Sequence, residues 1–331
     1  MQNLTHDEVA AKLWELNLEL SPEIPYRLET LFPRIEGWFV KGKIKDQFKL
    51  LKRLEPLLAE ILLDREEVQL VLPCNQSTLS DVFLMGSLWV GTSTCAVLVL
   101  TNLRIYCIRV NDTGVPQQSF WQIYYSQIKE VDQSLFGDTL FYLKDGRKLK
   151  YSGIVPEDQR RLQFIVWENC KTFRKQGFEP SVSQSREQVC GHCFDVIPPG
   201  VYECDSCGAQ YWRPIEVGMR SFIFPSWGDF VMKHTTLALM ELIGFTFIIG
   251  FTIAAFFEGK YLAGIILYVT ANLADALMSV QLATRALHLK STPFERPDMW
   301  SLTNPERLVQ EQREAGTGYE GYRVADAAEQ L

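Results

Sequence analysis

The chain lacks the surplus of positive charge that marks nucleic-acid-binding proteins. Its 331 residues include 33 Lys and Arg against 40 Asp and Glu, so its net charge at pH 7 is −7. Because a nucleic-acid-binding surface carries a strongly basic footprint, we expect no nucleic-acid partner. The first twenty residues also lack the apolar core of a secretory signal, since they contain Asp7, Glu8, Glu15 and Glu19.

A recognisable catalytic arrangement is missing as well. The sequence has no nucleophile paired with a base, no glycine-rich loop that would cradle phosphates and no metal-ligand pattern that leaves a coordination position open. We therefore predict a protein that is not an enzyme. Positive charge is also missing from one long internal stretch, because no Lys or Arg occurs between Arg65 and Arg104.

Long apolar runs are present, in contrast, near the C-terminal end. The runs Thr235–Phe257 and Tyr261–Ala283 flank a polar break of three residues, Glu258-Gly259-Lys260. At 1.5 Å per residue each run makes a helix of roughly 34 Å, enough to cross a bilayer core of ~30 Å. The break fits only a tight turn, so we predict a two-helix transmembrane hairpin within residues 235–284. The alternative is a pair of buried helices in a soluble protein.

The cations around the hairpin predict its orientation. The turn carries only Lys260, beside Glu258, whereas more cations lie before the first run and after the second. These flanking residues are Arg213, Arg220, Lys233, Arg285 and Lys290. Because cationic flanks stay in the cytoplasm, we expect an integral membrane protein with both termini cytoplasmic, in a plasma or inner membrane.

Two acids within the hairpin are not needed by a simple anchor. Glu241 lies about 9 Å from the start of the first run and Asp275 about 12 Å from the end of the second. The two therefore fall at similar depth in an antiparallel hairpin, and Asn272 shares the face of Asp275. Since ionisable residues in a span indicate function by default, we predict an intramembrane polar site of Glu241, Asn272 and Asp275. The alternative is a pair of shallow acids that are protonated or hydrogen-bonded across the helix pair.

The chain before the hairpin changes from helical to strand periodicity. Residues 1–64 have helical spacing, with a capping box of Thr5 and Glu8 and a later apolar face that Pro56 should kink or split. We predict a helical region that packs on the next domain, or alternatively a partner-binding helix pair. Eight short strand-like segments follow, and a helix from Pro156 to Gly177 comes after them. The segments are residues 67–72, 80–89, 95–100, 104–110, 120–125, 129–133, 139–143 and 148–151.

Residues 66–176 resemble the bacterial PH and GRAM-like domains. Residues 98–106 are similar to the family's vlTnkRly strand, residues 123–131 are similar to its ipyskItsve strand, and residues 135–138 stand at its glycine turn. The resemblance implies an antiparallel β-barrel with a C-terminal helix. We assign Thr101 and Arg104 structural roles, in a turn and an edge strand.

PH-like domains suggest phosphoinositide binding, but this chain argues against it. Recognition of several phosphate charges needs Lys and Arg on the first hairpin, where this sequence has none. A different set of cations surrounds the Asp145-Gly146 turn and could touch anionic lipid headgroups. The set consists of Lys144, Arg147, Lys148 and Lys150. The alternative is a solvated hairpin tip.

The most specific motif follows a linker at residues 177–188. Two C-x₂-C pairs stand ten residues apart, which is the spacing of a Cys₄ zinc ribbon. The predicted ligands are Cys190, Cys193, Cys204 and Cys207. A ribbon at residues 189–214 is too small to hold a core of its own, so we predict one structural Zn²⁺. Iron bound as in rubredoxin is the alternative. A ribbon followed by two spans also resembles membrane zinc-ribbon proteins of uncharacterised function, which implies an architecture and no activity.

These observations predict a multidomain α+β protein. Its remaining parts are an interfacial segment at residues 215–234 and a polar cytoplasmic tail at residues 285–331. We predict a non-enzymatic adaptor whose PH-like domain and ribbon present a protein- or lipid-binding surface at the cytoplasmic membrane face. Its partner would be another protein or a second copy. The alternatives are an oligomeric channel or transporter-like protein that uses Glu241 and Asp275, and a regulatory subunit whose ribbon senses metal.

Overall fold

The computed structural model describes residues 4–76, 94–111, 114–135 and 137–292. The described residues divide into two compact units, of which the first lies within residues 4–76 and 95–199 and the second comprises residue 94 and residues 200–292. Helices and antiparallel strands are mixed, as predicted. The predicted strand at residues 80–89 and most of the predicted tail lie outside the described residues.

The first unit begins with two predicted helices, α1 (His6–Glu15) and α3 (Val40–Ile61), and with the short helix α2 (Leu28–Leu31), which the sequence did not predict. The capping box of α1 is confirmed, because Thr5 Oγ1 accepts a hydrogen bond from the Glu8 amide and Glu8 Oε2 accepts one from the Thr5 amide. Of the two predicted effects of Pro56, a kink or a split, the split is wrong, since α3 runs through the proline. Fully buried leucines on both sides of the proline hold the helix against the core, namely Leu51, Leu54 and Leu58.

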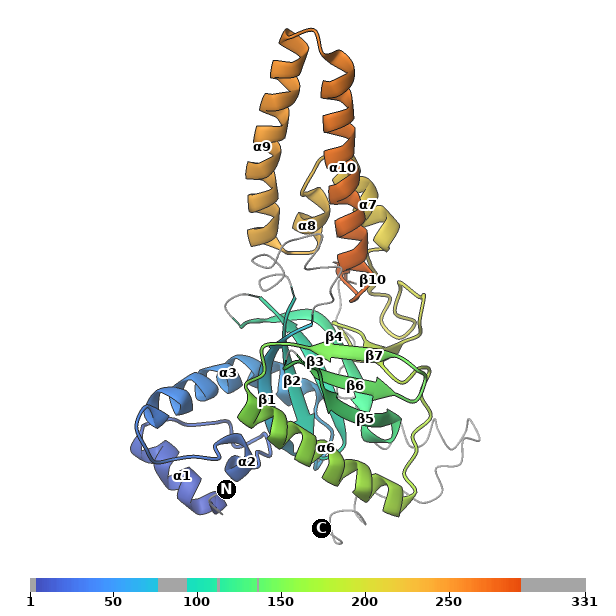
Figure 1. The fold of residues 1–331 in the computed structure, drawn as a ribbon. Helices are drawn as coiled ribbons and strands as arrows, with labels where there is room; N and C mark the ends of the chain where they lie inside the picture. Colours follow the sequence, from blue (N-terminus) through green and yellow to red (C-terminus); the bar gives the residue numbers. More distant parts are fainter. Residues whose placement is uncertain (1–3, 77–93, 112–113, 136, 293–331) are drawn as a thin grey trace. The chain divides into compact units, whose positions relative to one another are not determined.

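Antiparallel strands form the centre of this unit in two sheets (Figure 1). The larger has the order β1-β2-β3-β4-β8-β9 and the smaller has the order β5-β6-β7. The strands of the larger sheet are β1 (Val68–Asn75), β2 (Cys95–Thr101), β3 (Arg104–Val110), β4 (Pro116–Tyr124), β8 (Glu187–Val189) and β9 (Val196–Ile197). Those of the smaller are β5 (Ile128–Gln133), β6 (Thr139–Leu143) and β7 (Lys148–Tyr151), and the 3₁₀ turn η1 (Tyr125–Gln127) precedes β5. Over the described residues neither sheet closes into a barrel, and a bridge between Asn75 and Ser152 is isolated.

Two local predictions in this unit are confirmed. The turn between β6 and β7 has Gly146 at φ +85, a conformation that glycine adopts without strain. Helix α6 (Pro156–Gln176) has its proline in the first turn and ends at Gly177, whose φ is +65. Along its buried side Asn169 donates hydrogen bonds to Gln69 Oε1 at 2.9 Å and to the Thr101 carbonyl at 3.3 Å, so α6 is tied to β1 and β2.

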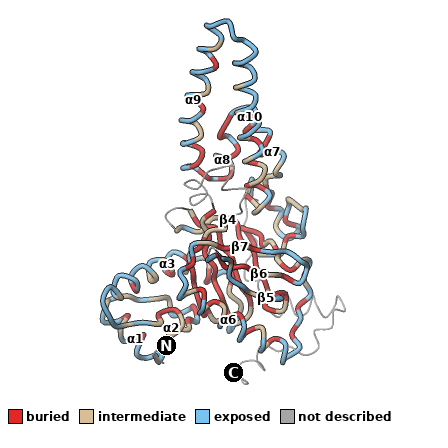
Figure 2. Tube along the Cα trace, viewed as in Figure 1, coloured by how far each residue is buried: buried red, intermediate tan, exposed pale blue. Residues whose placement is uncertain are grey.

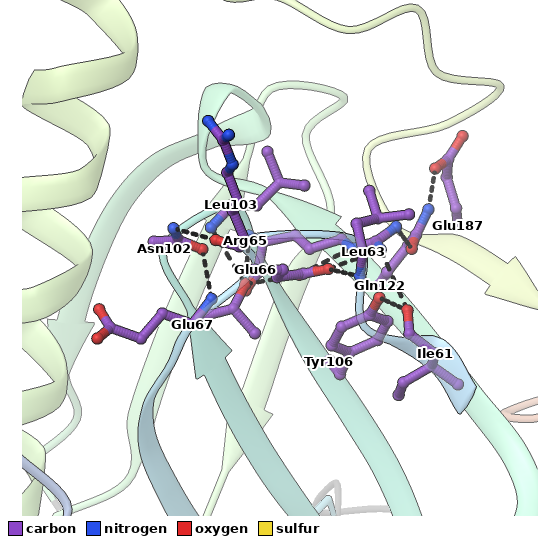
Figure 3. Close-up of polar contacts among 12 residues, drawn as sticks. Ile61, Leu63, Arg65, Glu66, Glu67, Asn102, Leu103, Tyr106, Gln122 and Glu187 are labelled. Atoms are coloured by element: carbon purple, nitrogen blue, oxygen red, sulfur yellow. Dashed lines mark hydrogen bonds and ion pairs between the residues drawn. The ribbon is translucent and has the colours of Figure 1, made fainter. Parts of the chain in front are cut away.

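Thr101 and Arg104 belong to a buried polar network with Glu66. Figure 3 shows Glu66 beside Gln122 and Tyr106 in this network. Thr101 Oγ1 accepts the amides of Leu103 and Arg104, which confirms its role in the turn. Arg104 donates to Glu66 Oε1 at 3.1 Å and to Gln122 Oε1 at 2.8 Å. The predicted edge position of Arg104 is wrong, because β3 lies between β2 and β4. An interior strand exposes no edge to solvent, so the guanidinium is instead satisfied by buried acceptors.

The second unit contains the two apolar helices with the predicted bounds, α9 (Thr235–Phe257) and α10 (Tyr261–Ala283). Both are long and apolar enough to cross a membrane. They run side by side to the turn, and exposed residues predominate along both of them (Figures 1 and 2). The short helices α7 (Pro214–Ile223) and α8 (Trp227–Val231) pack beside α10. After α10 the chain forms β11 (Leu289–Ser291), which pairs with β10 (Gln210–Tyr211), a return that the sequence did not predict.

Candidate functional site

The two C-x₂-C pairs form two turns with the same backbone pattern. In the first, the Cys190 amide donates to the Asp195 carbonyl at 2.8 Å and the Phe194 amide donates back to Cys190 at 3.1 Å. In the second, the Cys204 amide donates to the Ala209 carbonyl at 2.9 Å and the Gly208 amide donates back to Cys204 at 2.8 Å. The fifth residue of each turn has a positive φ, +64 at Phe194 and +69 at Gly208. This is the local geometry that points two thiols toward one ion.

The four predicted ligands are grouped closely enough to hold a metal ion. Their Sγ atoms all lie within 4.8 Å of one another, and Cys190, Cys193 and Cys204 are buried. Sulfurs about 3.8 Å apart surround a tetrahedral zinc with Zn–S bonds of about 2.3 Å, and this separation falls within the 4.8 Å limit of the cluster. The Cys190 sulfur also accepts the His192 amide at 3.4 Å, which stabilises a thiolate.

Three of the remaining cysteines are placed as packed thiols. Burial raises the pKa of Cys107 to about 12 and that of Cys170 to about 11, and it also raises the pKa of Cys74 well above its ordinary value. A thiol that stays protonated at neutral pH is a poor nucleophile and a poor metal ligand. These residues therefore offer no second cysteine chemistry.

Two of the three residues of the predicted intramembrane site lie together in the structure, and a further acid joins them. Carboxylate oxygens of Glu241 on α9 and Asp275 on α10 lie within 4.8 Å of each other and of a third acid, Asp229 on α8. We call these three residues the acidic triad. Asn272 lies on α10 and its Nδ2 donates to the Tyr268 carbonyl at 3.0 Å. No hydrogen bond joins Asn272 to the triad among the residues that the structure describes.

Asp229 is the residue that reasoning from the sequence missed. It lies outside both apolar runs, in a five-residue helix between two turns. The only available signal was an acid beside Trp227 and Gly228 in an otherwise apolar entry segment. Its side chain is fully buried, and Oδ2 accepts a hydrogen bond from Ser279 at 3.2 Å. Burial raises the pKa of Asp229 to about 6, because it disfavours the charged carboxylate.

Small polar groups hold the triad in place. The Ser226 amide donates to Asp275 Oδ2 at 3.0 Å. Ser221 and Ser279 share a hydrogen bond of 2.7 Å, and the Gly228 amide donates to Ser221 Oγ at 3.0 Å. These contacts join α7, α8 and α10 at one end of the hairpin. A Cβ at Gly228 would lie 2.5 Å from Ser221 Oγ. The lack of a side chain at Gly228 therefore leaves room for these hydrogen bonds.

The predicted lipid-facing cations at the Asp145-Gly146 turn are engaged with their neighbours. Lys144 pairs with Glu179, Arg147 with Asp145 and Lys150 with Asp138. Lys148 lies over the Tyr142 ring, 5.0 Å from its centroid. These partners reduce the positive charge that the turn presents to solvent.

A groove between β5 and α6 presents a second set of cations. Its volume is about 530 Å³, and its basic lining residues are Lys129, Lys171, Arg174 and Lys175. Among the described residues none of the four forms an ion pair. Trp167 also lines the groove and is 60% exposed, with the Lys171 ammonium 4.9 Å from its ring. In the sequence, Lys171, Arg174 and Lys175 indicated only the basic last turn of the predicted helix.

The chain thus carries a Cys₄ cluster, an acidic triad and a basic groove, in addition to two apolar helices. The cluster was predicted in full, the triad in part and the groove not at all. No protein-family model, no curated protein and no solved structure matches this chain.

Proposed function

We propose that this protein is a membrane-anchored, non-enzymatic adaptor that binds an extended acidic segment of a partner protein. The observation that carries the proposal is the groove between β5 and α6. It combines cations that lack ion-pair partners within the described chain with an exposed Trp167. The remaining modules serve as a scaffold: the Cys₄ cluster as a structural zinc ribbon and the apolar helices as the anchor.

The strand edge beside the groove suits an extended ligand. β5 is the outer strand of its sheet and pairs only with β6 over the residues that the structure describes. An outer strand presents backbone donors and acceptors in a row, so an extended peptide can add to it as a further strand. Ile128 is buried whereas Lys129 and Glu130 are exposed, which leaves this edge accessible to a ligand in the groove.

The charge of the groove favours an acidic partner. Four cations and Glu130 line it, and α6 supplies Lys171, Arg174 and Lys175 from its last turns. Charge complementarity of this kind steers association and rejects basic partners. Trp167 adds a flat apolar surface, and tryptophan is enriched among residues that dominate binding energy. Anionic lipid is less well matched, since a vesicle surface cannot pair with a strand edge.

The order of antiparallel strands followed by a covering helix supports a PH-like origin for residues 66–176. The predicted lack of phosphoinositide binding is retained in this proposal, because the new basic surface lies along α6 and not on the first hairpin. Exposed apolar residues on α7, including Ile215, Met219 and Ile223, support an interfacial position for this helix beside the spans.

Peptide selection on the detergent-purified full chain tests the proposal. A displayed library of random peptides should enrich acidic sequences, and a fluorescent copy of one such peptide should bind the wild type. The triple variant Lys129→Glu, Lys171→Glu, Arg174→Glu should weaken this binding at least about tenfold, because it reverses the charge of the groove.

The matched control reverses the same charge at the Asp145-Gly146 turn, through Lys144→Glu, Arg147→Glu and Lys148→Glu. Binding by this control should stay within about twofold of the wild type. Equal losses of peptide binding in the two variants would show nonspecific electrostatic attraction and would refute the groove as the binding site. Failure to enrich acidic peptides would refute it as well, and vesicles that bind the wild type but not the groove variant would assign the surface to lipid.

A second candidate function is a channel or transporter-like protein that uses Glu241 and Asp275. The observation that favours it is that both acids lie together with the buried Asp229 at one end of the apolar helices. Cation flux into liposomes that hold the purified chain should fall in the double variant Glu241→Gln, Asp275→Asn. Flux that is equal in both proteins, or absent from the wild type, contradicts this function.

A further inference from the structure

The acidic triad brings three carboxyl groups together, with Asp229 buried and Glu241 and Asp275 partly buried. Oxygens of Asp229, Glu241 and Asp275 lie within 4.8 Å of one another, and the Asp229 side chain has no exposed surface. No Lys or Arg forms an ion pair with any of the three among the described residues. His234 Nδ1 lies 3.4 Å from Asp229 Oδ1. Buried charge of one sign requires compensation.

Oxygens without a hydrogen-bond partner in the described chain, on Glu241 within the triad and on Ser226 beside it, indicate where a compensating cation would bind. Both carboxylate oxygens of Glu241 are shielded from solvent and accept no hydrogen bond within the described chain. Ser226 is 0% exposed and its Oγ likewise has no hydrogen-bond partner among these residues. The backbone amide of the same serine lies 3.0 Å from Asp275 Oδ2, so its hydroxyl borders the triad. Buried oxygens are rarely left without a partner unless an ion or a water satisfies them.

We propose that Asp229, Glu241 and Asp275 bind one divalent cation of the oxygen-preferring class, with Ser226 Oγ as a neutral ligand or as a partner of a bound water. Carboxylates, hydroxyls and water are the ligands of Mg²⁺, Mn²⁺ and Ca²⁺. Three carboxylates and a hydroxyl leave positions of a six-coordinate ion to water, which suits Mg²⁺ and Mn²⁺ in particular. This site requires neither of the functions proposed above.

The chemistry of the donors separates this site from the Cys₄ cluster. Thiolates select Zn²⁺ or iron, whereas carboxylates select the harder cations. Mg²⁺ and Mn²⁺ would therefore not compete for the Cys₄ cluster. Zn²⁺ also binds carboxylates, so zinc is supplied at no more than one equivalent per chain when the triad is tested.

The cation would also have a structural consequence. Asp229 belongs to α8, Glu241 to α9 and Asp275 to α10, so one ion would join three helices that otherwise meet through serine hydroxyls and a small apolar cluster with Leu237 and Leu282. Neutral replacement of the acids would not restore this link, because amides bind such ions much more weakly than carboxylates do. We therefore expect the cation to stabilise the end of the hairpin where α8 lies.

Manganese binding by the detergent-purified full chain tests the proposal. The ribbon is first saturated with Zn²⁺, and Mn²⁺ is then titrated at pH 7 while the free ion is followed by electron paramagnetic resonance. We expect one Mn²⁺ per chain, displaced by Mg²⁺. Glu241→Gln and Asp275→Asn should each weaken this binding at least about tenfold, as expected when a ligand is removed from a metal site. Glu258→Gln removes an exposed acid at the end of α9 and should leave it unchanged.

Folding of the variants is checked by zinc content and by elution as a single species. A thermal shift supplies the second measurement: Mn²⁺ should raise the unfolding temperature of the wild type but not that of Glu241→Gln. The proposal is overturned if the wild type binds no Mn²⁺, which would mean that protons alone compensate the three acids. It is equally overturned if the Gln and Asn variants bind Mn²⁺ as tightly as Glu258→Gln does.

Discussion

Arg104 Nη2 lies 2.9 Å from Glu66 Oε2, in an ion pair whose side chains are only 9% and 1% exposed. The network around this pair extends to the end of α3 and to β8 (Figure 3). Tyr106 Oη donates to the Ile61 carbonyl at 3.1 Å, and Gln122 Nε2 donates to Glu187 Oε2 at 2.9 Å. One set of polar contacts thus connects β3 and β4 with the end of α3 and with β8, the strand that precedes Cys190.

Removal of one partner of this ion pair should destabilise the first unit strongly. Glu66→Gln leaves the Arg104 guanidinium buried without its counter-charge, and such changes cost about 3–5 kcal/mol. The loss should appear as faster hydrogen exchange of β3 peptides in the full chain. The control is Arg147→Met, which breaks the exposed pair with Asp145 and should cost no more than about 1 kcal/mol. Equal effects of the two variants would contradict the importance of the buried pair.

The same network predicts a dependence of stability on pH. Burial raises the pKa of Glu187 above its ordinary value of 4.5, although the hydrogen bond from Gln122 opposes the shift. The folded state therefore binds this proton more tightly than the unfolded state does. The contribution of Glu187 to stability is fully present below the unfolded-state pKa and is lost as the pH rises through the folded-state pKa.

Thermal unfolding of the full chain at a series of pH values from 4.5 to about 8 measures this effect. The difference in unfolding temperature between Glu187→Gln and the wild type should become more favourable to the variant as the pH rises. The amide can keep only one of the two hydrogen bonds that Glu187 accepts, so the slope and not the absolute value is the readout. A difference that is constant with pH would contradict the assignment to Glu187.

Close packing at Gly228 gives a third prediction. A Cβ at this position would lie 2.5 Å from Ser221 Oγ and 2.9 Å from Ser279 Oγ, so Gly228→Ala should displace both hydroxyls. Overpacking of this kind costs about 1–3 kcal/mol and should lower the unfolding temperature in detergent. Gly244→Ala on α9 is the control, since nothing lies within 4 Å of its Cβ. A control that loses as much stability as Gly228→Ala would rule out the steric explanation.

Removal of one ribbon ligand gives the fourth prediction. Cys207→Ser should reduce the bound zinc from one ion per chain to almost none, because a hydroxyl does not replace a thiolate in a Cys₄ site. Elemental analysis measures the metal, and limited proteolysis should show new cleavage between residues 190 and 212, as expected when metal binding supplies the folding energy. Cys170→Ser should keep the zinc. Iron instead of zinc in the wild type would identify a rubredoxin-like site, and a metal-free protein that resists the protease would exclude a structural metal.

The apolar helices, the helix ends and the paired cysteines were predictable because each depends on neighbours in the sequence. An apolar run of sufficient length makes a helix such as α9 or α10 in any apolar surrounding. A capping residue such as Thr5 acts on the next turn, and a positive φ at Gly146 follows from the turn itself. The bounds of these elements agree with the structure for the same reason.

Contacts between distant segments could not be predicted in the same way. Residues just before Cys190 form β8 and add to β4, although the sequence suggested a separate ribbon after a linker. The open sheets differ from the predicted closed barrel, because closure depends on register and twist across several strands. The alternation of side chains along one strand predicts neither the register nor the twist.

The sequence by itself determined the apolar hairpin, the two paired cysteine motifs and the helix α6, since periodicity and spacing act over a few residues. Only the tertiary structure decided that Asp229 joins Glu241 and Asp275, and that the cations of α6 lie beside the outer strand β5. The physical reason is that side chains far apart along the chain meet only where packing closes the intervening loop. Many residues contribute to the free energy of that packing, so no single motif predicts it.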